Sequence, residues 1–341
     1  MIKKQSINPK TCAFVLSGGG CFGSFEAGVL EYLIGEAHAD FSGLYGISIG
    51  AVNAATLAGA ARGKPGLAKQ LGHLEYLWDR ITDFFHPHLG YINAYSINWN
   101  GFLSQSLFSA KNLIEYIESI LDEKALCNLY ANHREFAVGT VSDADGQIHL
   151  FRNSNAVLDD EMKRQLVNYV VGSMSLPLVF PPRDISIQGQ THQCFDGGLR
   201  ESSLLIRALA DRRYDDIVVI NCGAKNLPFS GRLKGMLQYA ERAFDIWNNN
   251  NTQSIMDNAR TLTRIMRESG QGEMEIFHDG QPMKIKAAKL HIFEPGSDSS
   301  AELTFDNELD FDPQKIQLAI QYGKKVAEEV CKKQHLVFGD G

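Results

Sequence analysis

The feature that most constrains the fold of this chain is a serine held between two glycines, in the run Gly46-Ile47-Ser48-Ile49-Gly50. The apolar residues before the run are typical of a strand, and the small residues after it are typical of a helix that packs closely on a sheet. A turn this sharp leaves no room for side chains at its flanks, which explains Gly46 and Gly50. The run therefore predicts a strand, a tight turn and a helix, with the Ser48 hydroxyl lifted clear of the sheet as a nucleophile.

A second strand, turn and helix precedes this one. Residues 13–17 form a short apolar run that ends at Gly18-Gly19-Gly20, and a helical spacing of apolar residues begins at Gly23. Backbone N–H groups at such a turn can hold the phosphate of a nucleotide or the oxyanion of a reaction intermediate. Because the phosphate-loop lysine is missing and the glycines do not follow G-x-G-x-x-G, the sequence favours the oxyanion and no nucleotide.

Composition excludes several kinds of partner. A chain of 341 residues with 44% hydrophobic content can bury a large core. The net charge is −7, with Lys and Arg scattered along the chain, so we expect no nucleic-acid partner. The 6 cysteines form no C-x-x-C pair, and we expect neither a metal site nor a disulfide framework. Without a secretory or membrane-spanning segment, the expected location is cytoplasmic, with possible peripheral membrane association.

Three blocks, taken in order, resemble the patatin-like phospholipase family. Similarity extends to the segment from Gly172 to Pro182 and to that from Val138 to Gly146, so the resemblance covers residues 11–225. It implies an α/β fold with a central, mostly parallel sheet flanked by helices, a three-layer sandwich related to the α/β-hydrolases. The three blocks are Gly18-Gly19-Gly20-Cys21-Phe22-Gly23, Gly46-Ile47-Ser48-Ile49-Gly50 and Asp196-Gly197-Gly198.

The resemblance also implies a mechanism. It assigns a catalytic dyad to Ser48 and Asp196, with the serine attacking a phospholipid or other lipid ester and the aspartate taking its proton. It implies no cofactor, and transient contact with a membrane surface. The chemistry of the residues agrees, because a hydroxyl needs an adjacent base and a partly buried carboxylate can serve as one. The oxyanion hole is assigned to the N–H groups of Gly18, Gly19 and Gly20, and the glycines at positions 23, 46, 50, 197 and 198 complete the motifs.

Two alternatives to this hydrolase stay open. Phe22 stands where the family usually has Arg or Lys, which leaves the oxyanion to backbone donors, so a lipid-binding protein with weak or lost catalysis is one alternative. A Ser-His-Asp triad esterase is the other, with His192 the histidine nearest to Asp196 in the sequence. His86 and His88 are expected on a solvent-exposed loop.

The remaining chain is expected to belong to the same domain, residues 1–341. Within it we expect a catalytic core over 11–225, a mainly helical surface segment over 226–288, and a last strand and closing helix over 289–341. The tetrad Asn248-Asn249-Asn250-Asn251 is expected to interrupt the helical stretch around it.

Two further segments carry predictions. Residues 136–151 have the pattern of a hairpin that turns at Asp143 to Gly146. The segment from Tyr91 to Phe108 is rich in aromatic residues, and is either an acyl-chain wall or interfacial lid or an ordinary packed loop.

Overall fold

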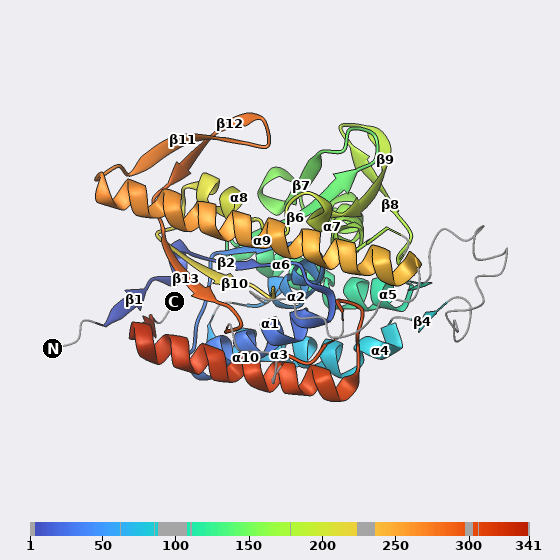
Figure 1. Cartoon of the computed structure of the whole chain (residues 1–341), viewed down its shortest axis with the longest axis horizontal. Coiled ribbons are helices and arrows are strands. Elements are labelled where there is room, and N and C mark those ends of the chain that lie inside the picture. Colours follow the sequence, from blue (N-terminus) through green and yellow to red (C-terminus); the bar gives the residue numbers. More distant parts are fainter. Residues whose placement is uncertain are drawn as a thin grey trace.

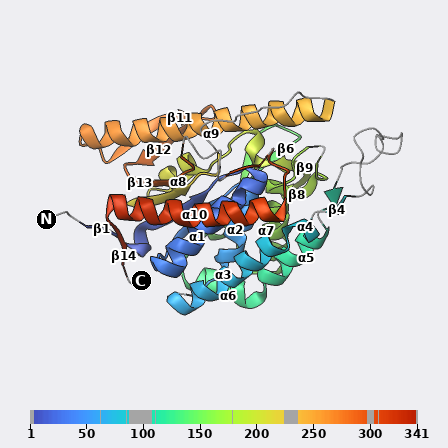
Figure 2. The same cartoon turned by 60° about the horizontal axis from the view of Figure 1, so that its bottom comes forward.

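The computed structural model describes residues 4–61, 63–84, 86–87, 108–109, 111–177, 179–223, 236–296, 303–305 and 307–339. Its centre is an eight-stranded sheet between two layers of helices (Figures 1 and 2). Along the sheet the strands are β13 (Lys289–Phe293), β10 (Asp216–Ile220), β2 (Cys12–Leu16), β3 (Gly43–Gly46), β6 (Glu135–Ser142), β9 (Gln190–Asp196) and β8 (Arg183–Ile187), and β7 (Ile148–Arg152) pairs with β6.

The sheet is mixed but mostly parallel. The five strands from β13 to β6 pair in parallel, and β7, β8 and β9 pair antiparallel. The predicted fold class is therefore confirmed, and so is the hairpin over residues 136–151, which is formed by β6 and β7.

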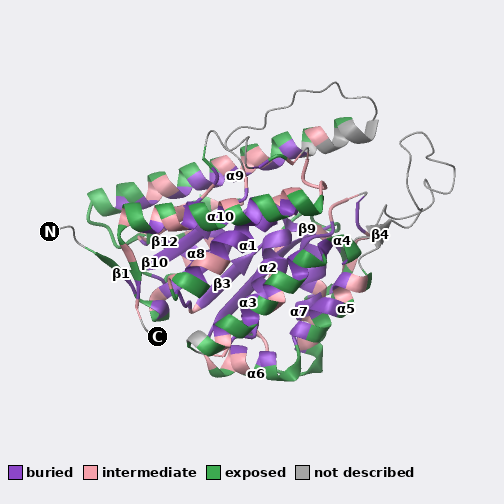
Figure 3. Ribbon diagram, turned by 90° about the horizontal axis from the view of Figure 1, so that it is seen from below, coloured by how far each residue is buried: buried purple, intermediate pink, exposed green. Residues whose placement is uncertain are grey.

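The side chains of each strand point alternately to the two faces of the sheet, and this divides the hydrophobic core into two layers. On β2, Phe14 and Leu16 pack into one cluster, whereas Ala13 and Val15 pack into the other, because successive side chains of a strand point to opposite faces. Figure 3 shows the buried sheet and the helices over its first face. Those helices are α1 (Gly23–Glu31), α2 (Ile49–Ala58), α3 (Lys64–Asp79), α4 (Ile81–Phe84), α5 (Lys111–Ile120), α6 (Glu123–Ala131), α7 (Asp160–Ser173) and α10 (Pro313–Gln334), and the second face carries α8 (Leu205–Asp211) and α9 (Met236–Glu268).

Strands β3 and β9 meet end to end along one edge of β6. Gly46, the last residue of β3, lies opposite Val138, and Asp196, the last residue of β9, lies opposite Thr140. The other edge of β6 is occupied by β7 over the same stretch. Because β3 runs parallel to β6 and β9 runs antiparallel to it, their carboxyl ends converge. The Ser48 turn and the Asp196 block, the second and third of the three sequence blocks, are brought together there.

The C-terminal third differs from the expectation in three ways. Helix α9 continues through the Asn248–Asn251 tetrad, so the predicted interruption is wrong: the Asn248 side chain donates to Glu308, and the Asn251 side chain donates to the carbonyl of Arg200. The segment 226–288 also holds a hairpin of β11 (Glu273–His278) and β12 (Gln281–Lys286). The last strand is β14 (Leu336–Phe338), which follows α10 and pairs in parallel with β1 (Gln5–Ile7).

Helices α1 and α10 cross at unusually short range, side by side in Figures 1 and 2. A Cβ on Gly28 of α1 would lie 2.0 Å from the carbonyl oxygen of Ile320, and one on Gly323 of α10 would lie 2.2 Å from that of Phe25. Each helix therefore needs its glycine for this contact.

The aromatic segment expected around Tyr91 to Phe108 lies outside the described residues except for Phe108, which pairs with Pro87 where β4 (His86–Pro87) meets β5 (Phe108–Ser109). His88 also lies outside them. Among the helices that the structure describes, none combines the length and the apolar character that a membrane span requires.

Candidate active site

Ser48 occupies the tight turn between β3 and α2 that its sequence predicts. Its backbone has φ 53° and ψ −130°, a conformation that residues with a side chain rarely adopt. A Cβ on Gly46 would lie 2.5 Å from the carbonyl oxygen of Gly50, and one on Gly50 would lie 2.5 Å from that of Ser17. Both glycines are therefore required by close backbone contacts, and together they allow the strained turn that presents the serine.

The hydroxyl of Ser48 contacts the carboxylate of Asp196. Ser48 Oγ donates to Asp196 Oδ2 at 2.7 Å, and the backbone N–H of Gly198 donates to Oδ1, also at 2.7 Å. The contact follows from the meeting of β3 and β9 on β6, since each side chain lies at the end of its strand. Gly197 and Gly198 form the turn that follows β9, so the third sequence block provides the carboxylate and one of its two donors.

Asp196 is almost fully buried, with 4% of its surface exposed. Burial raises the pKa of this carboxyl to about 7, although the hydrogen bonds from Ser48 and Gly198 favour its charged form. A carboxyl with this pKa can both accept a proton and return it near neutral pH.

The loop formed by Gly18, Gly19 and Gly20, here called the glycine loop, lies directly against Ser48. A Cβ on Gly18 would be 3.1 Å from the Cβ of Ser48. The N–H of Gly18 already donates to the carbonyl of Ser202 at 3.0 Å, whereas no hydrogen bond of the described residues uses the N–H of Gly19 or Gly20. Of the three predicted oxyanion donors, these two are available, and Gly23 begins the helix α1 that follows the loop.

The three blocks thus come together around one hydroxyl. A family model for patatin-like phospholipases matches residues 14–209, more than half of the chain, and includes all three blocks. The chain belongs to the patatin-like phospholipase family. The recognition made from the sequence is confirmed, and with it lipid hydrolysis as the activity of the family.

Other comparisons add little to this assignment. Among solved structures, VipD from Legionella pneumophila is similar to this patatin-like chain, with 13% identity over 96% of this chain and 67% of VipD, at a TM-score of 0.41. A comparison with curated proteins gives no match.

Ser173 is a member of this patatin-like site that sequence reasoning did not single out. Its hydroxyl oxygen, at the end of α7, accepts the backbone N–H of Ser48 at 2.9 Å. The amide of Ser48 therefore supports the turn and is occupied. Ser173 lies in the block from Gly172 to Pro182 that resembles the family, so its place in that block was the available signal.

Histidine side chains are directed elsewhere in the described parts of the patatin-like fold. His192, the candidate for a triad, lies on β9 with its Nδ1 2.7 Å from the hydroxyl of Ser142 and its ring 6.2 Å from that of His149. The hydrogen bond of the Ser48 hydroxyl goes to Asp196.

A segment before α10 covers the glycine loop of this patatin-like chain. The carbonyl of Glu308 accepts the N–H of Cys21 at 2.8 Å, and the ring of Phe22 packs edge-on against Phe305, with centroids 5.1 Å apart. Phe22 is therefore held in an aromatic contact at the position where the family usually has a cation.

Glu308 also brings a second, half-buried carboxyl to the site. Its Oε1 accepts from the Asn248 side chain of α9 at 2.7 Å. Burial, followed by the negative charges of Asp245 and Asp196, raises the pKa of Glu308 to about 8, while the bond from Asn248 lowers it. Sequence reasoning missed Glu308, which belongs to no local motif, and it interpreted Asn248 only as part of a break in the helix.

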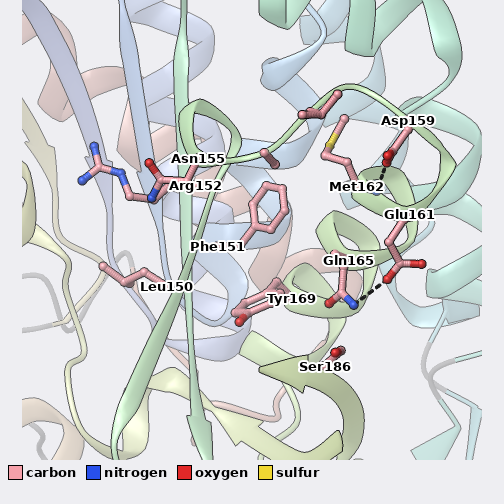
Figure 4. Close-up of a pocket in the computed structure, with 12 residues that line it drawn as sticks. Leu150, Phe151, Arg152, Asn155, Asp159, Glu161, Met162, Gln165, Tyr169 and Ser186 are labelled. Atoms are coloured by element: carbon pink, nitrogen blue, oxygen red, sulfur yellow. Dashed lines mark hydrogen bonds between the residues drawn. The ribbon is translucent and has the colours of Figure 1, made fainter. Parts of the chain in front are cut away.

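A cavity of about 390 Å³ lies away from these groups (Figure 4). It is lined by α7 from Glu161 to Tyr169, by β7, by the chain between them and by Ser186 of β8. Figure 4 shows Gln165 and Tyr169 of α7 facing Phe151 of β7. Ser173, whose hydroxyl contacts the Ser48 turn, is the last residue of α7. The lining includes neither Ser48 nor Asp196, so this cavity is separate from the candidate active site.

Proposed function

We propose that this protein is a serine acyl hydrolase of the phospholipase A type, which cleaves phospholipid or other lipid esters through Ser48 and Asp196. The observation that carries the proposal is the 2.7 Å hydrogen bond from the Ser48 hydroxyl to the buried Asp196 carboxylate. A serine hydroxyl is a weak nucleophile until a neighbouring base takes its proton, and this contact supplies the base.

Acylation follows from this geometry. Ser48 Oγ attacks the ester carbonyl carbon while its proton moves to Asp196. The negative charge on the carbonyl oxygen would be stabilised by the N–H groups of Gly19 and Gly20, which lie on the loop that contacts Ser48. When the intermediate collapses, the bond to the leaving alkoxide breaks and Asp196 returns the proton to it, which leaves an acyl group on Ser48.

Deacylation repeats these steps with water. Asp196 takes a proton from a water molecule, whose oxygen attacks the acyl carbon, and the proton then returns to Ser48 as the fatty acid leaves. A carboxyl with a pKa of about 7 suits both roles. No nucleotide or other cofactor takes part in these steps. A substrate held in a bilayer requires transient contact with the membrane surface, and the proposed location is cytoplasmic.

The test combines a fluorophosphonate probe, which reacts with activated serines, with a panel of phospholipids and soluble esters. We expect the probe to modify Ser48, and Ser48→Ala to lose labelling and at least about 10⁴-fold in kcat. Ser254→Ala is the matched control, because that serine of α9 is exposed and its hydroxyl donates to the carbonyl of Asn250 in its own helix. Retained turnover in Ser48→Ala, or an unreactive but folded wild type, would contradict the proposal; the latter would favour a lipid-binding protein.

A further inference from the structure

A buried chain of hydrogen bonds lies behind the glycine loop. Glu26, on α1, is completely buried, and both of its carboxylate oxygens accept hydrogen bonds. Oε1 accepts the backbone N–H of Ser17 at 2.7 Å, a donor that it shares with the carbonyl of Ile220 at 3.2 Å, and Oε2 accepts the Asn53 side chain at 2.9 Å. Among the ion pairs of the described residues, none involves Glu26, so hydrogen bonds alone satisfy this carboxyl.

Asn53, on α2, extends this chain of hydrogen bonds to a third helix. Its Oδ1 accepts the indole N–H of Trp78 on α3 at 2.9 Å, and its Nδ2 also donates to the carbonyl of Gly23 at 3.1 Å. The backbone N–H of Ser17 and the indole N–H of Trp78 can only donate. Because Ser17 and Trp78 are donors at the two ends of this hydrogen-bond chain, the Asn53 amide has one possible orientation. Glu26 must therefore accept on both of its oxygens.

The two groups that Glu26 joins belong to the two halves of the active site. Ser17 directly precedes the glycine loop, and Asn53 lies on the helix that begins after Ser48. The loop and the serine are already in contact, since a Cβ on Gly18 would lie 3.1 Å from that of Ser48. A change in the distance between Ser17 and Asn53 would therefore move the loop relative to the nucleophile.

We propose that Glu26 is a positioning residue, which holds the N–H groups of the glycine loop at the distance from Ser48 that the oxyanion requires. This inference rests on the proposed acyl hydrolase function. Misplacement of a catalytic group by about 1 Å can cost on the order of 100-fold in rate. The link between Glu26 and Asn53 therefore supports turnover without touching the substrate.

Glutamine at position 26 tests the hydrogen bonding with little change in shape. Ionised or protonated, a carboxyl can accept on both oxygens, whereas the amide nitrogen of glutamine cannot accept. In Glu26→Gln two donors face each other, either at Ser17 or at Asn53. We expect kcat on a short, soluble p-nitrophenyl ester to fall by about 10- to 100-fold, with KM within about twofold of wild type.

The matched control is Glu31→Gln, the same change on the same helix. Glu31 forms an ion pair with Lys324 of α10, away from the loop. We expect its kcat to remain within about twofold of wild type.

A reciprocal exchange provides the decisive measurement. Asn53→Asp alone places two carboxyls against each other and should also lower kcat. In Glu26→Gln with Asn53→Asp, the introduced amide nitrogen can donate to the introduced carboxylate. The amide oxygen then accepts from the N–H of Ser17, and the second carboxylate oxygen accepts from Trp78. The carbonyl of Gly23 loses its donor in the double variant, as it does in Asn53→Asp alone. We expect the double variant to recover at least about tenfold in kcat over Asn53→Asp, which lacks the same bond to Gly23, an effect that a loss of packing would not produce.

Each outcome decides the matter. If Glu26→Gln matches Glu31→Gln, or the double variant is no faster than Asn53→Asp, the positioning role is overturned while wild-type turnover keeps the proposed function. If the folded wild type neither turns over ester nor reacts with fluorophosphonate, the proposed function fails and this inference falls with it. Should Glu26→Gln not fold, Trp78→Phe replaces it, because it removes the donor that orients Asn53. We expect it to lower kcat about three- to tenfold, and an unchanged kcat overturns the proposal.

Discussion

Ser48 and Asp196 lie side by side but belong to two different regions of the sheet. The position of Ser48 depends on a local turn, whereas the position of Asp196 depends on strand pairing. Ser48 follows β3 in the parallel region, and its geometry is local, since the residues that allow the turn lie within five positions of sequence. Asp196 ends β9 in the antiparallel region, and it reaches the serine only because β9 pairs with β6 at Thr140. A nucleophile can thus be specified by a short motif, whereas its base is specified by the assembled sheet.

The largest expected effect comes from removing the proposed base. We expect Asp196→Asn to lower kcat by about 10³- to 10⁵-fold, because asparagine cannot take the serine proton. His192→Ala, on the same strand, should stay within about threefold of wild type, since His192 bonds to Ser142. Ester hydrolysis by purified, folded variants measures both. A folded His192→Ala protein as inactive as Asp196→Asn would replace the dyad with a triad.

A smaller effect is expected from strain in the local region. Gly46→Ala should lower the free energy of unfolding by about 1–3 kcal/mol and kcat by about 100-fold, because its Cβ would lie 2.5 Å from the carbonyl oxygen of Gly50. Gly72→Ala, in α3 with nothing within 4 Å, should instead raise stability by about 0.5–1 kcal/mol. Urea unfolding and ester hydrolysis report on both. Full turnover in Gly46→Ala would show that the turn tolerates a side chain.

The smallest effect is a pH dependence of stability that belongs to Asp196. Its pKa is about 7 in the folded protein and about 3.9 when unfolded. Between these values the folded state binds more protons, so this carboxyl makes the unfolding free energy fall as pH rises from about 4 to 7. Asp196→Asn removes that decline. We expect the variant to match wild type near pH 4 and to exceed it by about 1–3 kcal/mol at pH 8.

Denaturant titrations across this pH range provide the measurement. Glu26, a completely buried carboxyl, remains in both proteins and contributes equally to both curves. In Asp196→Asn, Glu308 loses a negative charge that helps to raise its pKa, which adds to the difference in the same direction. Parallel stability curves for wild type and Asp196→Asn would show that the aspartate is not desolvated as its surroundings indicate.

Local motifs carried the predictions that were confirmed. They concern the Ser48 turn, the glycine turn at Gly18 to Gly20 and the hairpin of β6 and β7. Each has a signal within about fifteen residues of sequence, so each could be predicted from backbone requirements. The hairpin of β11 and β12 had such a signal as well, the dipeptide Asp279-Gly280, with positive φ at both positions, and it was overlooked.

Contacts between distant segments could not be predicted in this way. The asparagine tetrad of α9 has the composition of a break, yet Asn248 and Asn251 bond to Glu308 and to the carbonyl of Arg200, and tertiary partners outweigh helix propensity. Glu308 itself comes to the glycine loop from almost three hundred residues away. No sequence pattern near Glu308 or near the glycine loop predicts this contact.

The crossing of α1 and α10 has a consequence for biosynthesis. Gly28 and Gly323 let the two helices touch at the backbone, but α10 leaves the ribosome almost three hundred residues after α1. At about 5–20 residues per second this is a delay of roughly 15–60 s. Until then, the helix that follows the glycine loop lacks its largest partner, and Phe25 lacks its ring contact with Tyr322. The nascent chain thus displays an apolar helix face, a surface that chaperones bind, and the loop gains its full support only after α10 has emerged.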